Sequence, residues 1–412
     1  MKKLVYKNID IKSSKTHKTK LLIMAFVFII SLALSFFPQK IVSAEEAGES
    51  YSELNEQISI QLNNLDFGSF EKILAELQSS QYKIFGSTSF VSKVKSIISG
   101  DVSGGYDSVF SAVISVFFEE TLSFMPLLAT VMAVAILCSL ITQIRSNLGS
   151  KSVADVVHFV CFGVVIVLIV GAIMQLVGIT TSALSSMKAQ MDIAFPILLT
   201  IMTALGSVVT VGVYKPAVVL LSGGVMQIFN SVVLPIFIFA TVFSIISNIS
   251  SSVKLDKFAA FFNSTFKYVV GCVFTIFMAF LSIQGITAAT HDGVSIRTAK
   301  FALKSYVPIL GGYLSEGFDL ILAGSVLIKN AIGVSGLLLM FATIVIPVIK
   351  IGVFILMLKL VSAILEPISD SRISSFLGSA SKNLSMLNVT ILGVAFMYFI
   401  TIMLIMCTSN VI

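Results

Sequence analysis

Residues 334–365 read VSGLLLMFATIVIPVIKIGVFILMLKLVSAIL, an apolar run longer than the roughly 20 residues that cross a lipid bilayer as a helix. Similar runs recur from about residue 122 to the C-terminus. Of the 412 residues, 56% are hydrophobic and only 12% are charged, against about 25% charged in soluble proteins, and the mean hydropathy is +1.00. A soluble globule of this length has too little interior for so much apolar side chain. The sequence therefore predicts an all-α polytopic membrane protein.

The net charge of +6 does not indicate a nucleic-acid-binding protein. The lysines and arginines lie in short segments between the apolar runs, where basic residues set the orientation of a membrane protein. We therefore expect membrane lipid around the chain and no nucleic acid as a partner.

The first 44 residues have the layout of a secretory signal. A lysine-rich arm precedes the apolar run at residues 21–37, and Val42-Ser43-Ala44 supplies the small residues that a signal peptidase recognises. We predict a signal peptide over residues 1–44, with cleavage after Ala44. An uncleaved membrane anchor is the alternative, because 17 apolar residues are many for a signal.

Residues 45–115 are more polar than the sequence that follows. Their apolar side chains recur at helical spacing in three stretches, of which the first two are separated by Gly68-Ser69 and the third covers residues 90–98. We predict a small helical region outside the cytoplasm, packed on itself or on a partner.

Residues 116–412 are predicted to form a multispan membrane domain. Because the region before it is exported, a first span from about residue 122 to 144 places Arg145 in the cytoplasm, as the positive-inside rule requires. We count about seven transmembrane helices, with the C-terminus outside. Proline and glycine interrupt residues 194–231 and 307–343, which we predict to form tight hairpins or re-entrant segments. Simpler spans are expected at about 156–177, 268–286, 334–365 and 389–406.

An internal repeat is indicated by prolines at a fixed offset. Pro196 and Pro235 recur 112 residues later as Pro308 and Pro347, each in a matching apolar context. The basic segments 257–267 and 372–382 also align, at an offset of 115 residues. We interpret these matches as two parallel repeats, at about 178–284 and 285–406, of the kind that encloses a pathway in many transporters. The alternative is accidental similarity between apolar sequences.

Four charged residues are candidates for lining such a pathway. Glu316 and Asp319 lie three residues apart among glycines and apolar residues, and charges inside a membrane usually face a cavity or a partner. Lys329 and Lys350, together with Lys304, are their predicted counter-charges. Alternatively, the carboxylates lie at the outer surface and Lys350 extends to the membrane interface.

Catalysis is not expected. The chain has no phosphate-binding glycine loop followed by Lys-Ser or Lys-Thr, and its three histidines and four cysteines show no ligand or nucleophile spacing. We therefore predict no enzyme activity, no cofactor and no metal site.

Three stretches resemble the stage III sporulation protein AE family: QGITAA at 284–289, RTAKFALK at 297–304 and VPILGGYLSE at 307–316. The predicted signal peptide, helical exported region and multispan body agree with that family. The resemblance implies a protein of endospore-forming bacteria, made in the mother cell and located in the membrane around the engulfed forespore.

The resemblance also implies partners and a role. Members of the family belong to a set of eight proteins, AA to AH, which together with the forespore-side Q protein is thought to form a channel, or feeding tube, between the two cells. AA resembles a secretion ATPase, AG and AH resemble ring-forming components, and AE is the most permease-like member. We expect a permease-like core, with residues 45–115 docking ring components. The alternatives are a free-standing secondary transporter for a small solute and a non-conducting assembly scaffold.

Overall fold

The computed structural model describes residues 48–408, except 64, 78, 88, 101–105, 147–150, 250–254, 289–310 and 369–370. The predicted signal peptide, the cleavage after Ala44, and residues Lys304 and Pro308 lie outside the described residues. The chain divides into two units, Met1–Ser50 and Tyr51–Ile412, and the packing below is that of the second.

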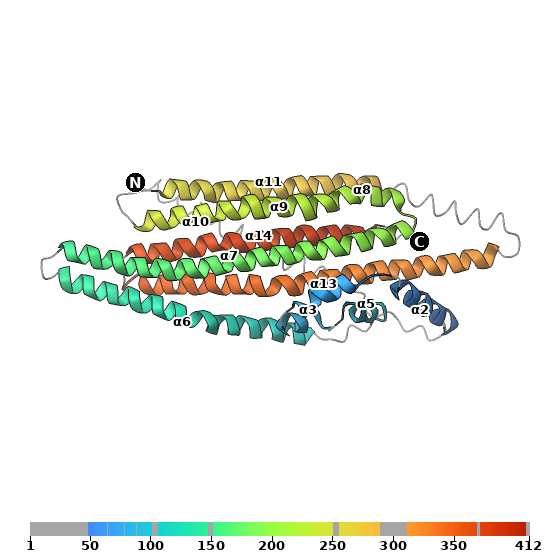
Figure 1. Cartoon of the computed structure of the whole chain (residues 1–412), viewed down its shortest axis with the longest axis horizontal. Helices are drawn as coiled ribbons and strands as arrows, with labels where there is room; N and C mark the ends of the chain where they lie inside the picture. Colours follow the sequence, from blue (N-terminus) through green and yellow to red (C-terminus); the bar gives the residue numbers. More distant parts are fainter. Residues whose placement is uncertain are drawn as a thin grey trace, which may run out of the picture. The chain divides into compact units, whose positions relative to one another are not determined.

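Every regular element in the described residues is a helix, which confirms the all-α prediction (Figure 1). The helices are α2 (Gly48–Asn63), α3 (Gly68–Ala75), α4 (Ser79–Phe85), α5 (Phe90–Ile98), α6 (Tyr106–Ser146), α7 (Lys151–Ala204), α8 (Val208–Val219), α9 (Met226–Ile228), α10 (Leu234–Ile249), α11 (Asp256–Ala288), α13 (Gly311–Leu365) and α14 (Ser371–Cys407), with π-helical segments η1 (Leu220–Val225) and η2 (Phe229–Val233) on either side of α9.

Six helices in the described residues are long and apolar enough to span a membrane, whereas about seven were predicted from the sequence. They are Val109–Ile141, Phe159–Ala204, Val208–Asn248, Asp256–Ile283, Asp319–Leu365 and Arg372–Cys407. If each of these six helices crosses the membrane once, the start of the first and the end of the last lie on the same side.

The predicted re-entrant segments are wrong, because proline and glycine do not break these helices. Pro196 lies inside α7, Gly223 and Gly224 lie in η1 of a helix that continues to Ile249, and residues 311–343 lie within the single helix α13. A proline removes one backbone hydrogen bond, whereas ending a helix in lipid leaves several polar groups without partners. A continuous helix is therefore more stable in the membrane than a helix that ends there. The basic segments 257–267 and 372–382 are likewise the first turns of α11 and α14 and not loops.

The chain does reverse once within residues 194–231, at the turn between α7 and α8. Gly206 has a φ of 80°, its N–H bonds to the Thr203 carbonyl, and the Ser207 N–H bonds to the Met202 carbonyl. These two bonds form a Schellman motif, which needs a left-handed residue at the position of Gly206. The hairpin prediction was therefore right about the reversal and wrong about its extent.

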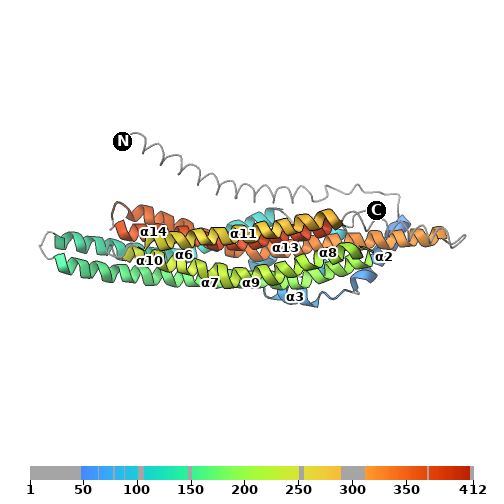
Figure 2. The same ribbon diagram turned by 90° about the horizontal axis from the view of Figure 1, so that it is seen from above.

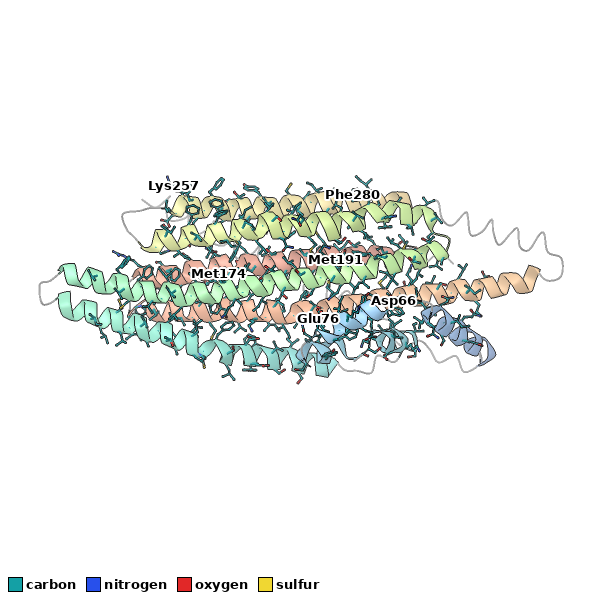
Figure 3. All side chains as sticks on the ribbon, viewed as in Figure 1. Asp66, Glu76, Met174, Met191, Lys257 and Phe280 are labelled. Carbon is teal, nitrogen blue, oxygen red and sulfur yellow. The ribbon has the colours of Figure 1, made fainter. Side chains whose placement is uncertain are left out.

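α13 and α14 form the centre of the bundle (Figures 1 and 2). α6 and α7 pack on one side of this pair, and α10 and α11 pack on the other. Figure 3 shows side chains filling the spaces between the ribbons, among them the fully buried Met191 of α7. At Gly333 of α13 an added Cβ would lie 2.5 Å from Met406 Sδ of α14, so a larger residue here would require the flexible Met406 side chain to move.

The long helices exceed the thickness of a bilayer. α7 has 54 residues and α13 has 55, which corresponds to about 80 Å each at 1.5 Å per residue, against about 30 Å of hydrocarbon. The exposed face of α7 changes character accordingly. It is apolar at Val156, Phe159, Val160, Val164 and Val167, and polar at Thr181, Ser182, Ser185, Lys188 and Asp192. Only the first part of this face suits contact with lipid.

The helices of the predicted exported region have a core of their own. Phe70 of α3 and Phe90 of α5 are fully buried, and their rings stack with centroids 3.9 Å apart. Glu71 Oε1 accepts bonds from Ser89 Oγ and from the Phe90 N–H, both at 2.9 Å, which fixes the start of α5. The helix predicted over residues 90–98 is confirmed, whereas α4 was not predicted.

Replacing Phe90 with alanine is expected to destabilise this region by about 3–5 kcal/mol, because it removes a large buried ring from a stacked pair. The measurement is the rate of limited proteolysis of α2–α5 in the full-length protein. Lys95→Ala, on the exposed side of the same helix, is the control and should leave the rate unchanged. Equal rates for the two variants would contradict the role assigned to the Phe70–Phe90 pair.

Candidate functional site

An ion pair joins α6 and α13 within two of the candidate spans. Lys350 Nζ lies 3.1 Å from Glu120 Oε1 and 3.1 Å from Glu120 Oε2. The two side chains are 29% and 13% exposed, so both charges are largely removed from solvent. Charged groups in a membrane are costly and are usually paired or functional. This pair is the centre of the candidate site.

Aromatic packing and a second polar contact keep α6 and α13 in register around this pair. The rings of Phe124 on α6 and Phe354 on α13 lie 4.8 Å apart, one turn beyond the charged residues. Further along, Ser139 Oγ on α6 donates to the Ile368 carbonyl just after α13. The positions of Glu120 and Lys350 are thus fixed by packing on both helices.

A polar cluster lies on α13 two turns before Lys350. Pro347 has no N–H, so the Thr343 carbonyl, four residues earlier, lacks its usual helical donor. Gln81 Nε2 of α4 donates to this carbonyl at 3.4 Å. Gln190 of α7 is fully buried, and its Nε2 donates to Thr343 Oγ1 at 2.7 Å. One short stretch of α13 therefore receives polar contacts from α4, α6 and α7.

Lys329 of α13 lies elsewhere, against the end of α14. Its side chain is fully buried, and its Nζ donates to the carbonyls of Met406 at 3.1 Å and Thr408 at 2.5 Å. The last carbonyls of a helix lack intrahelical partners and carry partial negative charge. Lys329 therefore caps the C-terminus of α14, a role that was not predicted from the sequence.

The four predicted pathway residues do not form one site. The side chain of Glu316 lies outside the described residues, and Asp319 is half-buried near the start of α13. Lys350 lies 31 positions further along the same helix, which is about 46 Å, and it pairs with Glu120. The prediction that Lys350 is a counter-charge to Glu316 or Asp319 is therefore wrong. α13 is continuous, and a continuous helix keeps these residues apart.

Glu120 was missed because the first span was expected to begin at about residue 122. The helix begins at Tyr106, and Phe110, Phe117 and Phe118 are large apolar residues exposed on its surface. Continuing the apolar pattern back through these residues would have placed Glu120 inside the helix. Gln81 and Gln190 had no comparable signal, since each is a single amide far from Thr343 in sequence.

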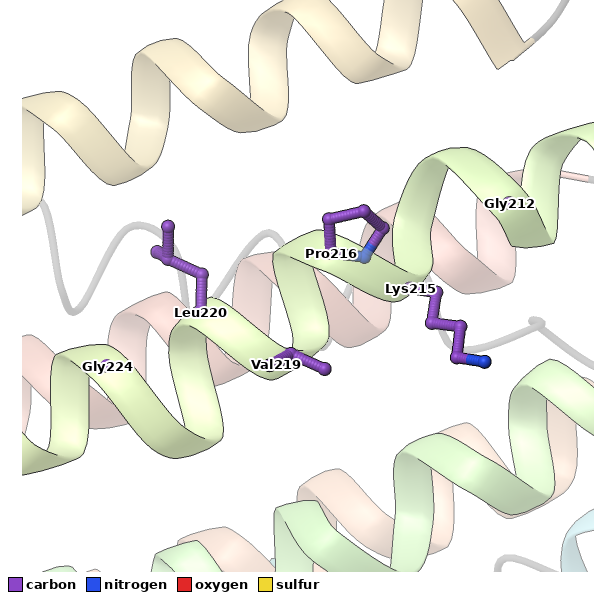
Figure 4. Close-up of a pocket in the computed structure, with 6 residues that line it drawn as sticks. All are labelled: Gly212, Lys215, Pro216, Val219, Leu220 and Gly224. Atoms are coloured by element: carbon purple, nitrogen blue, oxygen red, sulfur yellow. The ribbon is translucent and has the colours of Figure 1, made fainter.

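A shallow open groove lies on the surface of α8 and η1 (Figure 4). It is lined mostly by apolar atoms of Gly212, Pro216, Val219, Leu220 and Gly224, with the Lys215 side chain at its edge. Nothing in the groove brings reactive groups together. Within the part of the chain that the structure describes, no three His, Cys, Asp or Glu residues lie close enough to share a metal ion.

Six long apolar helices with an ion pair between two of them define a polytopic α-helical membrane protein. The family model of stage III sporulation protein AE matches residues 88–409, and the chain belongs to this family. Stage III sporulation protein AE of Bacillus subtilis (strain 168) is 25% identical over 313 residues, which cover 76% of this chain and 78% of the relative. A search of solved structures finds no significant match.

Proposed function

We propose that this membrane sporulation protein is the permease-like core of a channel between the mother cell and the forespore. The observation that carries the proposal is the Glu120–Lys350 pair, because a scaffold held together by packing has no need of a charged pair between two membrane helices. The neighbouring Gln190 and Thr343 extend the polar lining along α13. A channel core and an assembly scaffold differ in the activity they predict for variants of these residues that still assemble.

The proposed topology places the α6 N-terminus and residues 45–115 outside the cytoplasm. If each long helix crosses once, Arg145 at the end of α6, Lys257 at the start of α11 and Arg372 at the start of α14 share one side of the membrane. That side is cytoplasmic by the positive-inside rule. The exported region would then face the space between the two membranes, where the ring components AG and AH and the forespore-side Q protein are the proposed partners, with the ATPase AA on the cytoplasmic side.

The test replaces Glu120 with glutamine and Lys350 with glutamine in the native host. These variants keep hydrogen-bonding capacity and similar volume while removing one charge. The family resemblance implies that the protein is needed for late gene expression in the forespore. A channel core that loses one charge of the pair should lose most of this expression, while the protein still reaches the membrane and still co-purifies with its partners. A normal level of expression, or its loss together with partner recruitment, would instead indicate a scaffold.

A free-standing solute transporter is the second candidate, favoured by the similar helix pairs that contain Pro235 and Pro347. Each proline lies in a long continuous helix that is followed by another long helix, α11 or α14. Purified protein in liposomes distinguishes the two functions, because a transporter moves its solute without AA, AG, AH or Q.

A further inference from the structure

Pro347 interrupts the backbone hydrogen bonding of α13, and Gln81 of α4, a helix of the predicted exported region, contacts α13 at that point. We propose that Gln81 of α4 acts as a clamp on this proline hinge, so that α4 in place holds α13 at one angle and displacement of α4 lets the angle change. Such a clamp would set the conformation of α13 whether or not the protein conducts a solute.

At Pro347 one carbonyl of α13 loses its helical hydrogen-bond donor. In an uninterrupted helix the N–H of residue 347 would bond to the Thr343 carbonyl, and Pro347 removes that donor. Gln81 Nε2 supplies a replacement from outside the helix, at 3.4 Å. Proline kinks are sites where a helix changes direction, and an external group in the backbone ladder helps to set the angle.

α4 and α5 both pack against α13, so the amide of Gln81 is carried by a set of helices that has its own aromatic core. The bond is long for an N–H···O contact, which makes it weaker and easier to release than the contact between Gln190 Nε2 and Thr343 Oγ1 at 2.7 Å. A helix that belongs to a packed set and touches the Thr343 carbonyl through one weak contact suits a reversible clamp.

The part of α13 that follows Pro347 carries one residue of the ion pair. Lys350 is three residues past Pro347, and its ion pair with Glu120 joins this part of α13 to α6. A change of about 15° at Pro347 would displace Leu360, 13 residues further along, by about 5 Å. A displacement of α4 would thus change the angle of α13 at Pro347 and shift Lys350 relative to Glu120.

The experiment measures the position of the far arm of α13 in the full-length protein. Spin labels are attached at Leu360→Cys on α13 and Val167→Cys on α7, both exposed positions, after replacement of the four native cysteines. Pulsed electron resonance then gives the distance distribution between the labels. With Gln81→Leu we expect the mean distance to shift by about 5 Å, or the distribution to broaden by a similar amount.

The decisive comparison repeats Gln81→Leu in a Pro347→Ala background. Alanine restores the N–H that bonds to the Thr343 carbonyl, so Gln81→Leu should then leave the distance distribution unchanged. Pro347→Gly restores the same N–H and replaces the alanine variant if that one does not fold. An equal shift in both backgrounds, or no shift in either, would overturn the proposal.

A matched control is available on the same exported region. Gln61 of α2 also contacts α13, because Ser325 Oγ donates to Gln61 Oε1 at 2.9 Å, but this contact lies 22 positions before Pro347. Gln61→Leu should not move the labels. A shift as large as that of Gln81→Leu would mean that any loosening of the exported helices has the same effect, and the clamp would be refuted.

Discussion

Lys329→Glu is expected to prevent most of the protein from folding. The Lys329 side chain is fully buried and donates to two carbonyls at the end of α14. A carboxylate at this position cannot donate to them, and its negative charge faces the negative end of the α14 dipole. We expect a cost above about 5 kcal/mol, which is comparable with the whole stability of many domains.

The measurement is the monodisperse fraction of purified protein by size-exclusion chromatography in detergent, followed by thermal unfolding of what remains. Lys359→Glu makes the same change at an exposed position of α13 and should behave as the wild type. Lys329→Met keeps the volume, loses both hydrogen bonds and removes a buried charge, so it should lie between the two. If Lys329→Glu unfolds at the temperature of Lys359→Glu, the capping role is wrong.

Lys350→Met is expected to destabilise the bundle by about 2–3 kcal/mol, because it leaves the Glu120 carboxylate largely buried without its cation. The value is below that for a fully buried pair, since Lys350 keeps part of its exposure. Thermal unfolding of the protein in detergent, at two salt concentrations, gives the measurement.

Two double variants distinguish the interaction between Lys350 and Glu120 from the separate effects of each residue. Lys350→Met combined with Glu120→Leu should recover most of the lost stability, because an apolar pair can replace a buried ion pair at little cost. Exchange of the charges, Lys350→Glu with Glu120→Lys, should recover it as well. Additive losses in the double variants would show that the two residues do not interact.

The sequence was sufficient for the fold class and for the family, and insufficient for the course of the helices. Composition excluded a soluble fold, and the segments at 284–316 carried the family resemblance that the family match confirms. The prolines and glycines of residues 194–231 and 307–343 misled the span prediction, because they were expected to interrupt the helices there. In lipid a helix with one missing bond is less costly than an end with several.

The candidate site was predicted in part. Lys350 was singled out correctly as a charge inside an apolar run, but its partner lies on α6 and not on α13. That pairing depends on which helices are neighbours, and neither charge nor hydropathy encodes this. The contacts of Gln81 and Gln190 with Thr343 could not be predicted from the sequence for the same reason, since they join residues 262 and 153 positions apart.

α7 and α13 are each longer than the bilayer is thick, so a change of tilt is magnified at the end that lies outside the hydrocarbon. A rod that continues about 50 Å past the hydrocarbon moves its far end by about 4 Å when it tilts by 5° within the lipid. Membrane thickness and lipid composition alter the tilt of a helix through hydrophobic mismatch. A small change of tilt caused by a change in bilayer thickness would thus produce a larger displacement at the far ends of α7 and α13, and of any protein bound there.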